Sequence, residues 1–252
     1  MKLSYKILFQ CHFLPRDSRA IIIALKPLNG RTQKISAVVS AAIQRILDFL
    51  LPRSAAERLL DNADVQSFSR HTRPSSQNLP DIVSLYEYRD PLVKTLIWQV
   101  KFKGNRRLAK LAAELLYEPL LVELSEHALF EGISVPVIVP VPLATERLRE
   151  RGFNQAQRIA EEMKTLDGGK NFVVATAVAR IRETKSQTKS QNRRERLENL
   201  RGAFTVTKPR EIANRYVIVL DDVATTGATI GEIRKVLMEA GAASVIGLTL
   251  AH

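Results

Sequence analysis

The sequence has almost no cysteine. Cys11 is the only one among 252 residues, so an internal disulfide and a four-thiolate zinc site are both excluded. The four histidines lie far apart and show no metal-ligand spacing. We therefore expect no zinc. A chain with a single thiol is typical of a reducing compartment, so we expect a cytoplasmic protein.

Long apolar runs are also missing. No stretch of this sequence approaches the roughly 20 apolar residues of a membrane span. The apolar character of the first residues is broken by Tyr5, Lys6, Gln10 and His12, which makes a poor signal-peptide core. We expect no membrane span.

Negative charge is in deficit. Lys and Arg number 38 against 26 Asp and Glu, a formal net charge of +12, while the hydrophobic fraction of 45% is that of a globular protein. Such an excess suits anionic partners, either phosphorylated small molecules or nucleic acid. A generally basic surface without a specific partner is the alternative.

The most informative stretch is YVIVLDDVATTGAT, residues 216–229. Five large apolar residues predict a buried parallel strand, and Asp221 and Asp222 follow at its carboxyl end, where open α/β sheets bind ligands. Threonines and Gly227 then precede an apolar helical stripe. A helix N-terminus of this kind favours a phosphate. A capped strand-to-helix turn is the alternative, but two carboxylates with three threonines exceed what capping needs.

Strands and helices alternate along the second part of the chain, which predicts a mainly parallel α/β sheet. The expected strands are 82–88, 135–141, 172–179 and 216–220. The expected helices begin at Pro91, which Asp90 caps, at Leu108, at Asn154 and near Ile230.

The first part of the chain is expected to be helical and separate. Apolar spacing predicts an amphipathic helix over 35–51, packed on a core or lying on a membrane surface. Ser54 and Glu57 form the capping box of a second helix, 55–60. The polar, proline-containing stretch 67–80 is expected to be a linker. The predicted divisions are an extension (1–42), a helical segment (43–66), the linker and a domain (81–252).

Three basic segments have more than one interpretation. Residues 180–201 carry a net charge of +5 and are interpreted as a solvated loop, a nucleic-acid patch or a lid over the active site. KFKGN, 101–105, is a helix C-cap or part of a phosphate or nucleic-acid surface. RGFNQA, 151–156, is either a break and N-cap or a functional segment.

Taken together, these motifs resemble the ComF family, bacterial proteins related to type I phosphoribosyltransferases. The resemblance rests on KFKGN, PVPL (140–143), RGFNQA, RETKSQ (182–187), NRRERLENLRGAF (192–204) and the stretch 216–229, and covers about 81–252. It implies a type I phosphoribosyltransferase-like fold with a small helical N-terminal appendage. The usual four-cysteine zinc module of the family is absent.

The resemblance also implies a site for phosphoribosyl pyrophosphate with Mg²⁺. Asp221 and Asp222 would hold the ribose hydroxyls, and the loop after them the 5′-phosphate. The pyrophosphate would meet Mg²⁺, backbone N–H groups near the Pro-Val-Pro turn and cations of the lid. The residues expected in the site are Asp221, Asp222, Val223, Ala224, Thr225, Thr226, Gly227, Ala228, Thr229, Val141, Pro142, Leu143, Arg182 and Lys185.

Two functions remain open from the sequence. One is a protein that binds phosphoribosyl pyrophosphate and has a ComF-like role in DNA uptake or competence, with single-stranded DNA as a candidate partner. The other is an active phosphoribosyltransferase, a pentosyl-transferring glycosyltransferase, whose acceptor is an unidentified nucleobase or amine. The sequence shows no clear general base.

Overall fold

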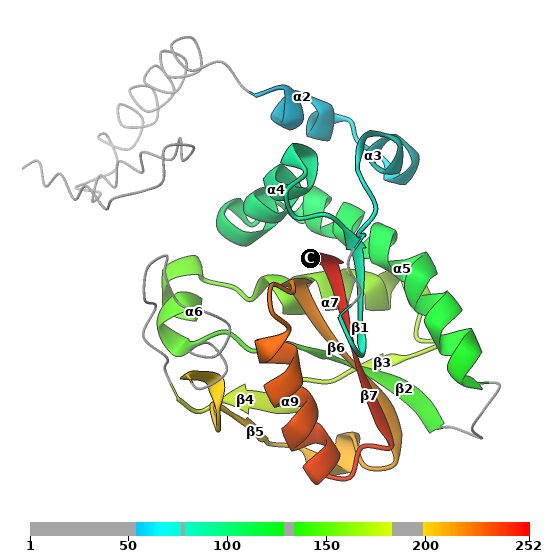
Figure 1. The fold of residues 1–252 in the computed structure, drawn as a ribbon, viewed down its shortest axis with the longest axis vertical. Helices are drawn as coiled ribbons and strands as arrows, with labels where there is room; N and C mark the ends of the chain where they lie inside the picture. Colours follow the sequence, from blue (N-terminus) through cyan, green and yellow to red (C-terminus); the bar gives the residue numbers. More distant parts are fainter. Residues whose placement is uncertain (1–53, 77–78, 129–133, 183–198) are drawn as a thin grey trace, which may run out of the picture. The chain divides into compact units, whose positions relative to one another are not determined.

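A five-stranded, fully parallel sheet forms the centre of the protein (Figure 1), with strand order β1-β7-β6-β2-β3. The structure, a computed structural model, describes residues 54–76, 79–128, 134–182 and 199–252. The strands are β1 (Ile82–Tyr86), β2 (Ser134–Pro140), β3 (Val173–Val174), β6 (Arg215–Val223) and β7 (Ser244–Ala251). This sheet confirms the predicted α/β class.

Helices cover both faces of the sheet. They are α2 (Ala55–Asp61), α3 (Val65–His71), α4 (Pro91–Trp98), the π-helix η1 (Gln99–Lys103), α5 (Arg106–Ala128), α6 (Thr145–Arg151), α7 (Gln155–Asp167), the 3-10 turn η2 (Pro209–Glu211) and α9 (Ala228–Glu239). A separate antiparallel pair is formed by β4 (Val178–Arg180) and β5 (Phe204–Val206).

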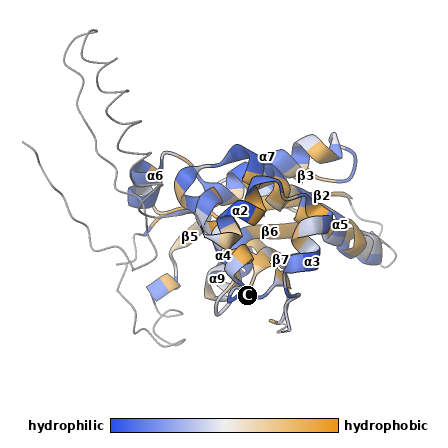
Figure 2. Cartoon of the chain, turned by 90° about the horizontal axis from the view of Figure 1, so that it is seen from above, coloured by the Kyte–Doolittle hydropathy of each residue, from blue (hydrophilic) through white to orange (hydrophobic). Residues whose placement is uncertain are grey.

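Strand β6 explains why the sheet is buried on both faces. Residues 216–220 are each 0% exposed, and successive side chains of a strand point to opposite faces. Tyr216, Ile218 and Leu220 pack in one core with α4, α5 and α7, whereas Val217 and Val219 pack in a second core with α9 and β5. Figure 2 shows the hydrophobic strands enclosed between helices that carry hydrophilic residues.

Local sequence signals set the starts of several helices. The Asp90 carboxylate accepts from the backbone N–H of Leu92 at 2.8 Å, and Pro91 occupies the first turn, as predicted for α4. Asn154 caps α7 in the same way through the N–H of Ala156.

Two boundaries differ from the sequence prediction. The apolar run 172–179 is not one strand: β3 stays in the main sheet, whereas β4 leaves it to pair with β5. The strand β6 does not end at Leu220 but continues to Val223, because β7 pairs with it as far as Ala251. Both carboxylates of the acidic pair therefore lie inside the last part of a strand.

The N-terminal helices partly confirm the prediction. Helix α2 begins at the predicted capping box of Ser54 and Glu57. Helix α3 was not predicted, and it occupies the first residues of the expected linker because Phe68, 0% exposed, packs in the sheet core. The amphipathic helix predicted over 35–51 lies outside the described residues. Within the described ranges, no helix has the length and apolar character needed to cross a membrane.

Candidate functional site

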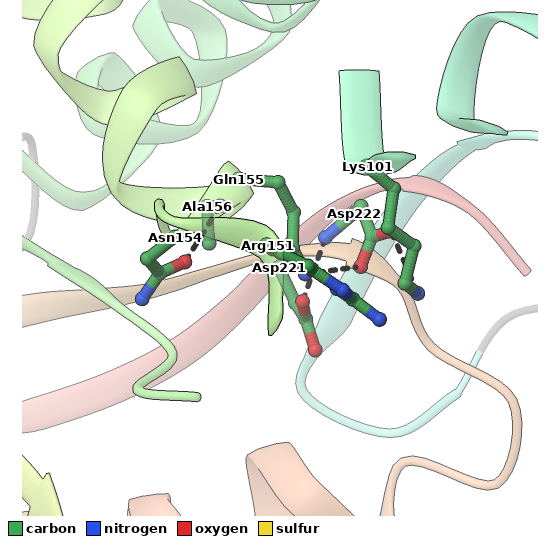
Figure 3. A network of polar contacts seen from close by, with 7 residues as sticks. All are labelled: Lys101, Arg151, Asn154, Gln155, Ala156, Asp221 and Asp222. Carbon is green, nitrogen blue, oxygen red and sulfur yellow. Dashed lines mark hydrogen bonds and ion pairs between the residues drawn. The ribbon is translucent and has the colours of Figure 1, made fainter. Parts of the chain in front are cut away.

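The side-chain alternation of β6 gives the two adjacent carboxylates different surroundings. Tyr216, Ile218 and Leu220 point towards the α5 and α7 face, so Asp222 follows them to that face. Asp221 points to the other face, where α9 packs. In Figure 3 the Asp222 carboxylate lies between Lys101 and Gln155, while the Asp221 carboxylate points away from them. The acidic pair is therefore not symmetric.

Asp222 is held by the protein itself. Its side chain is only 5% exposed, and one carboxylate oxygen lies 3.1 Å from the ammonium of Lys101 in η1. The other oxygen accepts from the Gln155 amide at 3.4 Å, and Gln155 in turn accepts from Arg151 at 3.1 Å. A buried carboxylate is costly unless it is paired, so this network accounts for the burial of Asp222.

The two aspartates differ in acidity for the same reason. Burial raises the pKa of Asp221 well above its usual value, and the neighbouring Asp222 charge raises it further. Burial opposes ionisation of Asp222 as well, but the Lys101 charge and hydrogen bonds from Asp221, Lys101 and Gln155 outweigh it and lower its pKa. Asp222 is thus the carboxylate that stays ionised, and Asp221 is the one that holds a proton more readily.

Asp221 is the member of the pair that can meet a ligand. It is partly exposed, and one carboxylate oxygen accepts the backbone N–H of Asp222 at 2.8 Å. The remaining acceptor positions suit hydroxyl groups of a sugar.

The loop after β6 brings backbone N–H groups to the same end of the sheet. Gly227 has φ +71°, a left-handed conformation that favours glycine, and a Cβ there would make a tight contact of 3.0 Å with the side chain of Ile82. It is the N-cap of α9 and supplies no side-chain cap. The first turn of a twelve-residue helix therefore begins in the loop that follows the acidic pair, with N–H groups that have no intrahelical partner.

The side chains of this loop are less uniform than the sequence suggested. Thr225 is exposed and Thr226 and Thr229 are partly exposed, whereas Ala224 and Ala228 are buried. The Thr226 hydroxyl accepts from the N–H of Ala228 at 3.4 Å. The whole predicted segment 221–229 thus forms one continuous strand end, loop and helix start.

The Pro-Val-Pro turn lies beside the acidic pair, as expected. The N–H of Val141 donates to the carbonyl of Leu220 at 2.9 Å, so β2 ends beside Leu220, the residue before the acidic pair. The carbonyl of Val141 accepts from the Asn154 side chain at 2.9 Å, which joins the turn to the start of α7. Pro142 and Leu143 follow, both partly exposed at this edge.

The predicted lid cations are not brought to this cluster within the described residues. Arg182 is exposed and donates to the carbonyl of Asn199 at 2.9 Å. It follows β4, whose pairing with β5 joins the two ends of the predicted lid. Lys185 and the rest of 183–198 lie outside the described residues, so the lid stays a prediction.

The structure adds residues that sequence reasoning did not place in the site. KFKGN and RGFNQA were weighed separately as caps, and both are caps: Gly104 ends η1 with φ +59° and Asn154 begins α7. The two motifs also meet, because the Arg151 guanidinium lies 4.8 Å from the ring centroid of Phe102. Arg158, two residues after RGFNQA, donates to the Gly104 carbonyl at 2.8 Å. Each motif contains one polar side chain near its cap that contacts Asp222. These are Lys101, three residues before Gly104, and Gln155, directly after Asn154.

The comparisons with known proteins agree with this architecture. No family model matches the chain. The chain is 32% identical to the DNA utilization protein YhgH of Salmonella typhimurium over 165 residues, 65% of this chain and 68% of that protein. It is 29% identical to competence protein F of Haemophilus influenzae over 71% of this chain and 77% of that one. Competence protein ComFC of Bacillus subtilis is 32% identical over 66% of this chain and 62% of its own. With these relatives and its phosphoribosyltransferase-like sheet, the chain belongs to the ComF family.

Proposed function

We propose that this protein binds phosphoribosyl pyrophosphate together with Mg²⁺ and acts in the uptake or use of DNA. The observation that carries the first part is the partly exposed Asp221 at the carboxyl end of β6, followed within a few residues by the Gly227 turn and the start of α9. A carboxylate next to helix N–H groups suits a sugar phosphate, whose hydroxyls donate and whose phosphate accepts.

The surroundings of Asp222 refine this assignment. One of its oxygens is ion-paired with Lys101 and the other accepts from Gln155, so we assign the ribose hydroxyls chiefly to Asp221. Asp222 keeps the strand end and its neighbours in position. The 5′-phosphate is assigned to the loop 225–229, and the pyrophosphate to the turn 141–143 with lid cations.

Magnesium fits a role on the ligand rather than on the protein. The described residues hold no group of three His, Cys, Asp or Glu side chains that could bind a metal ion. Mg²⁺ often keeps several waters and binds mainly to phosphate oxygens of a substrate. When bound with the pyrophosphate, it would neutralise the charge of that group.

The DNA role is supported by the relatives. The names of the Salmonella and Haemophilus proteins refer to DNA utilization and to competence. The net charge of +12 suits a polyanion. We therefore include single-stranded DNA as the partner of the proposed function.

Calorimetry with phosphoribosyl pyrophosphate and Mg²⁺ tests the ligand site. Asp221→Asn should weaken binding by about tenfold or more, because it removes a charge-assisted acceptor. Glu239→Gln, at the far end of α9 and 64% exposed, is the matched carboxylate control and should bind like wild type. Unaltered affinity in Asp221→Asn would overturn the assignment.

An active phosphoribosyltransferase is the second candidate, supported by the same partly exposed Asp221 and helix start at the carboxyl end of β6, since such an enzyme would bind phosphoribosyl pyrophosphate there as well. A pyrophosphate-release assay across nucleobases, amines and single-stranded DNA separates the two. Turnover with one acceptor identifies an enzyme, whereas binding without turnover identifies a ligand-binding protein.

A further inference from the structure

An aromatic pair lies where α4 runs into the turn that also supplies Lys101: Trp98 ends α4 and Phe102 belongs to η1. Phe102 is 55% exposed, and its ring centroid lies 6.0 Å from that of the half-buried Trp98. An exposed phenylalanine contributes little to a core. Since it sits on a π-helical turn, a feature frequent at functional sites, the position of Phe102 calls for an explanation outside the core.

Cations lie against both rings. The Arg151 guanidinium carbon is 4.8 Å from the centroid of Phe102, and the Lys103 ammonium is 5.1 Å from that of Trp98. Arg151 also donates to Gln155, which contacts Asp222. The aromatic pair is therefore connected to the acidic pair through Lys101 on one side and Arg151 on the other.

The surface around this pair is basic. Lys94, Lys103 and Arg106 are exposed on α4, η1 and the start of α5, and Arg147 and Arg149 are exposed on α6. Arg107, by contrast, is engaged by the protein, since it donates to the backbone carbonyls of Leu60 and Ala63. Lys103 and Arg151 thus lie against the two aromatic rings, and the other exposed cations lie on the same or neighbouring elements, with Glu146 and Glu150 also exposed on α6. Aromatic rings with adjacent cations are typical of surfaces that bind single-stranded nucleic acid.

We propose that Trp98, Phe102 and Arg151 form a base-stacking platform for single-stranded nucleic acid at the edge of the ligand site. Flat bases would stack on the rings and on the guanidinium plane, while the neighbouring lysines and arginines contact the phosphates. The platform is open rather than enclosed, which suits a base within a chain more than a free base. The proposal rests on the DNA part of the proposed function and not on phosphoribosyl pyrophosphate binding.

Trp98 provides a direct reporter, because it is the only tryptophan in the chain. A single-stranded DNA oligonucleotide of about 15 nucleotides, near the upper site size of one binding fold, should quench its fluorescence. An abasic oligonucleotide with the same number of phosphates should bind more weakly and leave the fluorescence unchanged. An RNA oligonucleotide of the same length shows which sugar is preferred.

Two kinds of variant separate stacking from charge. Phe102→Leu keeps an apolar side chain but removes the ring, and should lower oligonucleotide affinity about five- to hundredfold with an unchanged salt slope. Lys103→Gln removes one phosphate contact, so the slope of log affinity against log salt concentration should fall by about one, while DNA should still quench the Trp98 fluorescence. Val122→Ala removes an equally exposed apolar side chain, 58% exposed on α5, and should bind DNA like wild type.

The outcomes distinguish the two levels of the proposal. If wild type binds the oligonucleotide and Phe102→Leu binds it equally well, the platform is wrong while the DNA role stands. If wild type binds no single-stranded nucleic acid, both the platform and the DNA role fall, although the phosphoribosyl pyrophosphate site is untouched. Equal quenching by abasic and normal DNA would show that no base stacks there.

Discussion

The ammonium of Lys101 lies 3.1 Å from a carboxylate oxygen of Asp222, although the two residues belong to different motifs far apart in the sequence. Lys101 comes from the KFKGN turn after α4, and Asp222 from the end of β6. This ion pair fixes Asp222 within the protein and leaves Asp221 available to a ligand. The two aspartates differ in role because neighbouring side chains of one strand point to opposite faces of the sheet.

Replacing Lys101 should destabilise the protein, because the Asp222 carboxylate would stay buried without its ion-pair partner. Lys101→Met leaves Asp222 as a buried, uncompensated charge, and we expect the free energy of unfolding at pH 8 to fall by about 3 kcal/mol in urea denaturation. The loss should shrink as the pH is lowered, because without Lys101 the pKa of Asp222 rises above 3.8 and the carboxyl group takes up a proton.

Two further variants check this reason. Lys101→Arg keeps the charge and should lose much less stability. The double variant Lys101→Met/Asp222→Asn removes both charges and should recover most of the loss. A double variant as unstable as Lys101→Met alone would show that packing of the lysine stem, not the charge, is responsible.

Asp221→Asn should raise the stability of the protein while it weakens ligand binding. The pKa of Asp221 is raised in the folded state above the usual 3.8, so the protein loses stability as the pH rises from 3.8 to that raised pKa, and the loss is complete above it. At pH 8 the asparagine amide avoids this cost. We expect the free energy of unfolding to rise by on the order of 0.5–2 kcal/mol, measured by thermal or urea unfolding.

The stability gained by Asp221→Asn should depend on pH. As the pH falls towards 3.8, wild-type Asp221 is protonated in the folded protein, and the advantage of asparagine should disappear. A gain that stays constant from pH 8 to pH 4 would mean that it does not come from ionisation.

Much of the fold could be predicted from the sequence, because its signals are local. The apolar run 216–220, the Asp90 cap and the capping box of Ser54 and Glu57 each act within a few residues. The site was predicted only in part. Asp221, Asp222 and the Gly227 turn are contiguous, whereas the contact of Asp222 with Lys101 depends on how η1 packs over the sheet edge. No periodicity in a single sequence reports such a contact.

The missed helix α3 shows a second limit. The segment after residue 66 is polar and contains prolines, so its composition indicated a linker. A single buried ring, Phe68, anchors it by packing edge-on against Tyr86 with centroids 5.4 Å apart. Two apolar residues in seven, Val65 and Phe68, produce no detectable pattern, yet the buried ring is enough to fix a two-turn helix on a core.

Phe68→Ala tests whether this helix belongs to the domain. The ring is 0% exposed in the core that includes β1 and α5, so its removal should cost about 3–5 kcal/mol of unfolding free energy. Val65→Ala in the same helix, only partly buried, should cost clearly less. A loss below about 1 kcal/mol in Phe68→Ala would place α3 in a peripheral appendage.

Gly104 offers the sharpest test of how the two motifs meet. A Cβ at this position would lie 2.8 Å from a guanidinium nitrogen of Arg158 and 2.9 Å from the ring of Phe153. Gly168 is the matched control, because it has a similar left-handed conformation with φ +63° but no atom within 4 Å of its Cβ position. Gly168→Ala should therefore cost only backbone strain, about 1 kcal/mol, measured by urea denaturation.

Gly104→Ala should cost more than this control, because it adds steric overlap to the same strain and displaces Arg158 from the Gly104 carbonyl. We expect a total of about 2–4 kcal/mol. The displacement should also reach the site, since η1 carries Lys101, and ligand affinity should fall in Gly104→Ala but not in Gly168→Ala. If both variants lose the same stability, the contact between KFKGN and RGFNQA contributes nothing, and the glycine serves the cap alone.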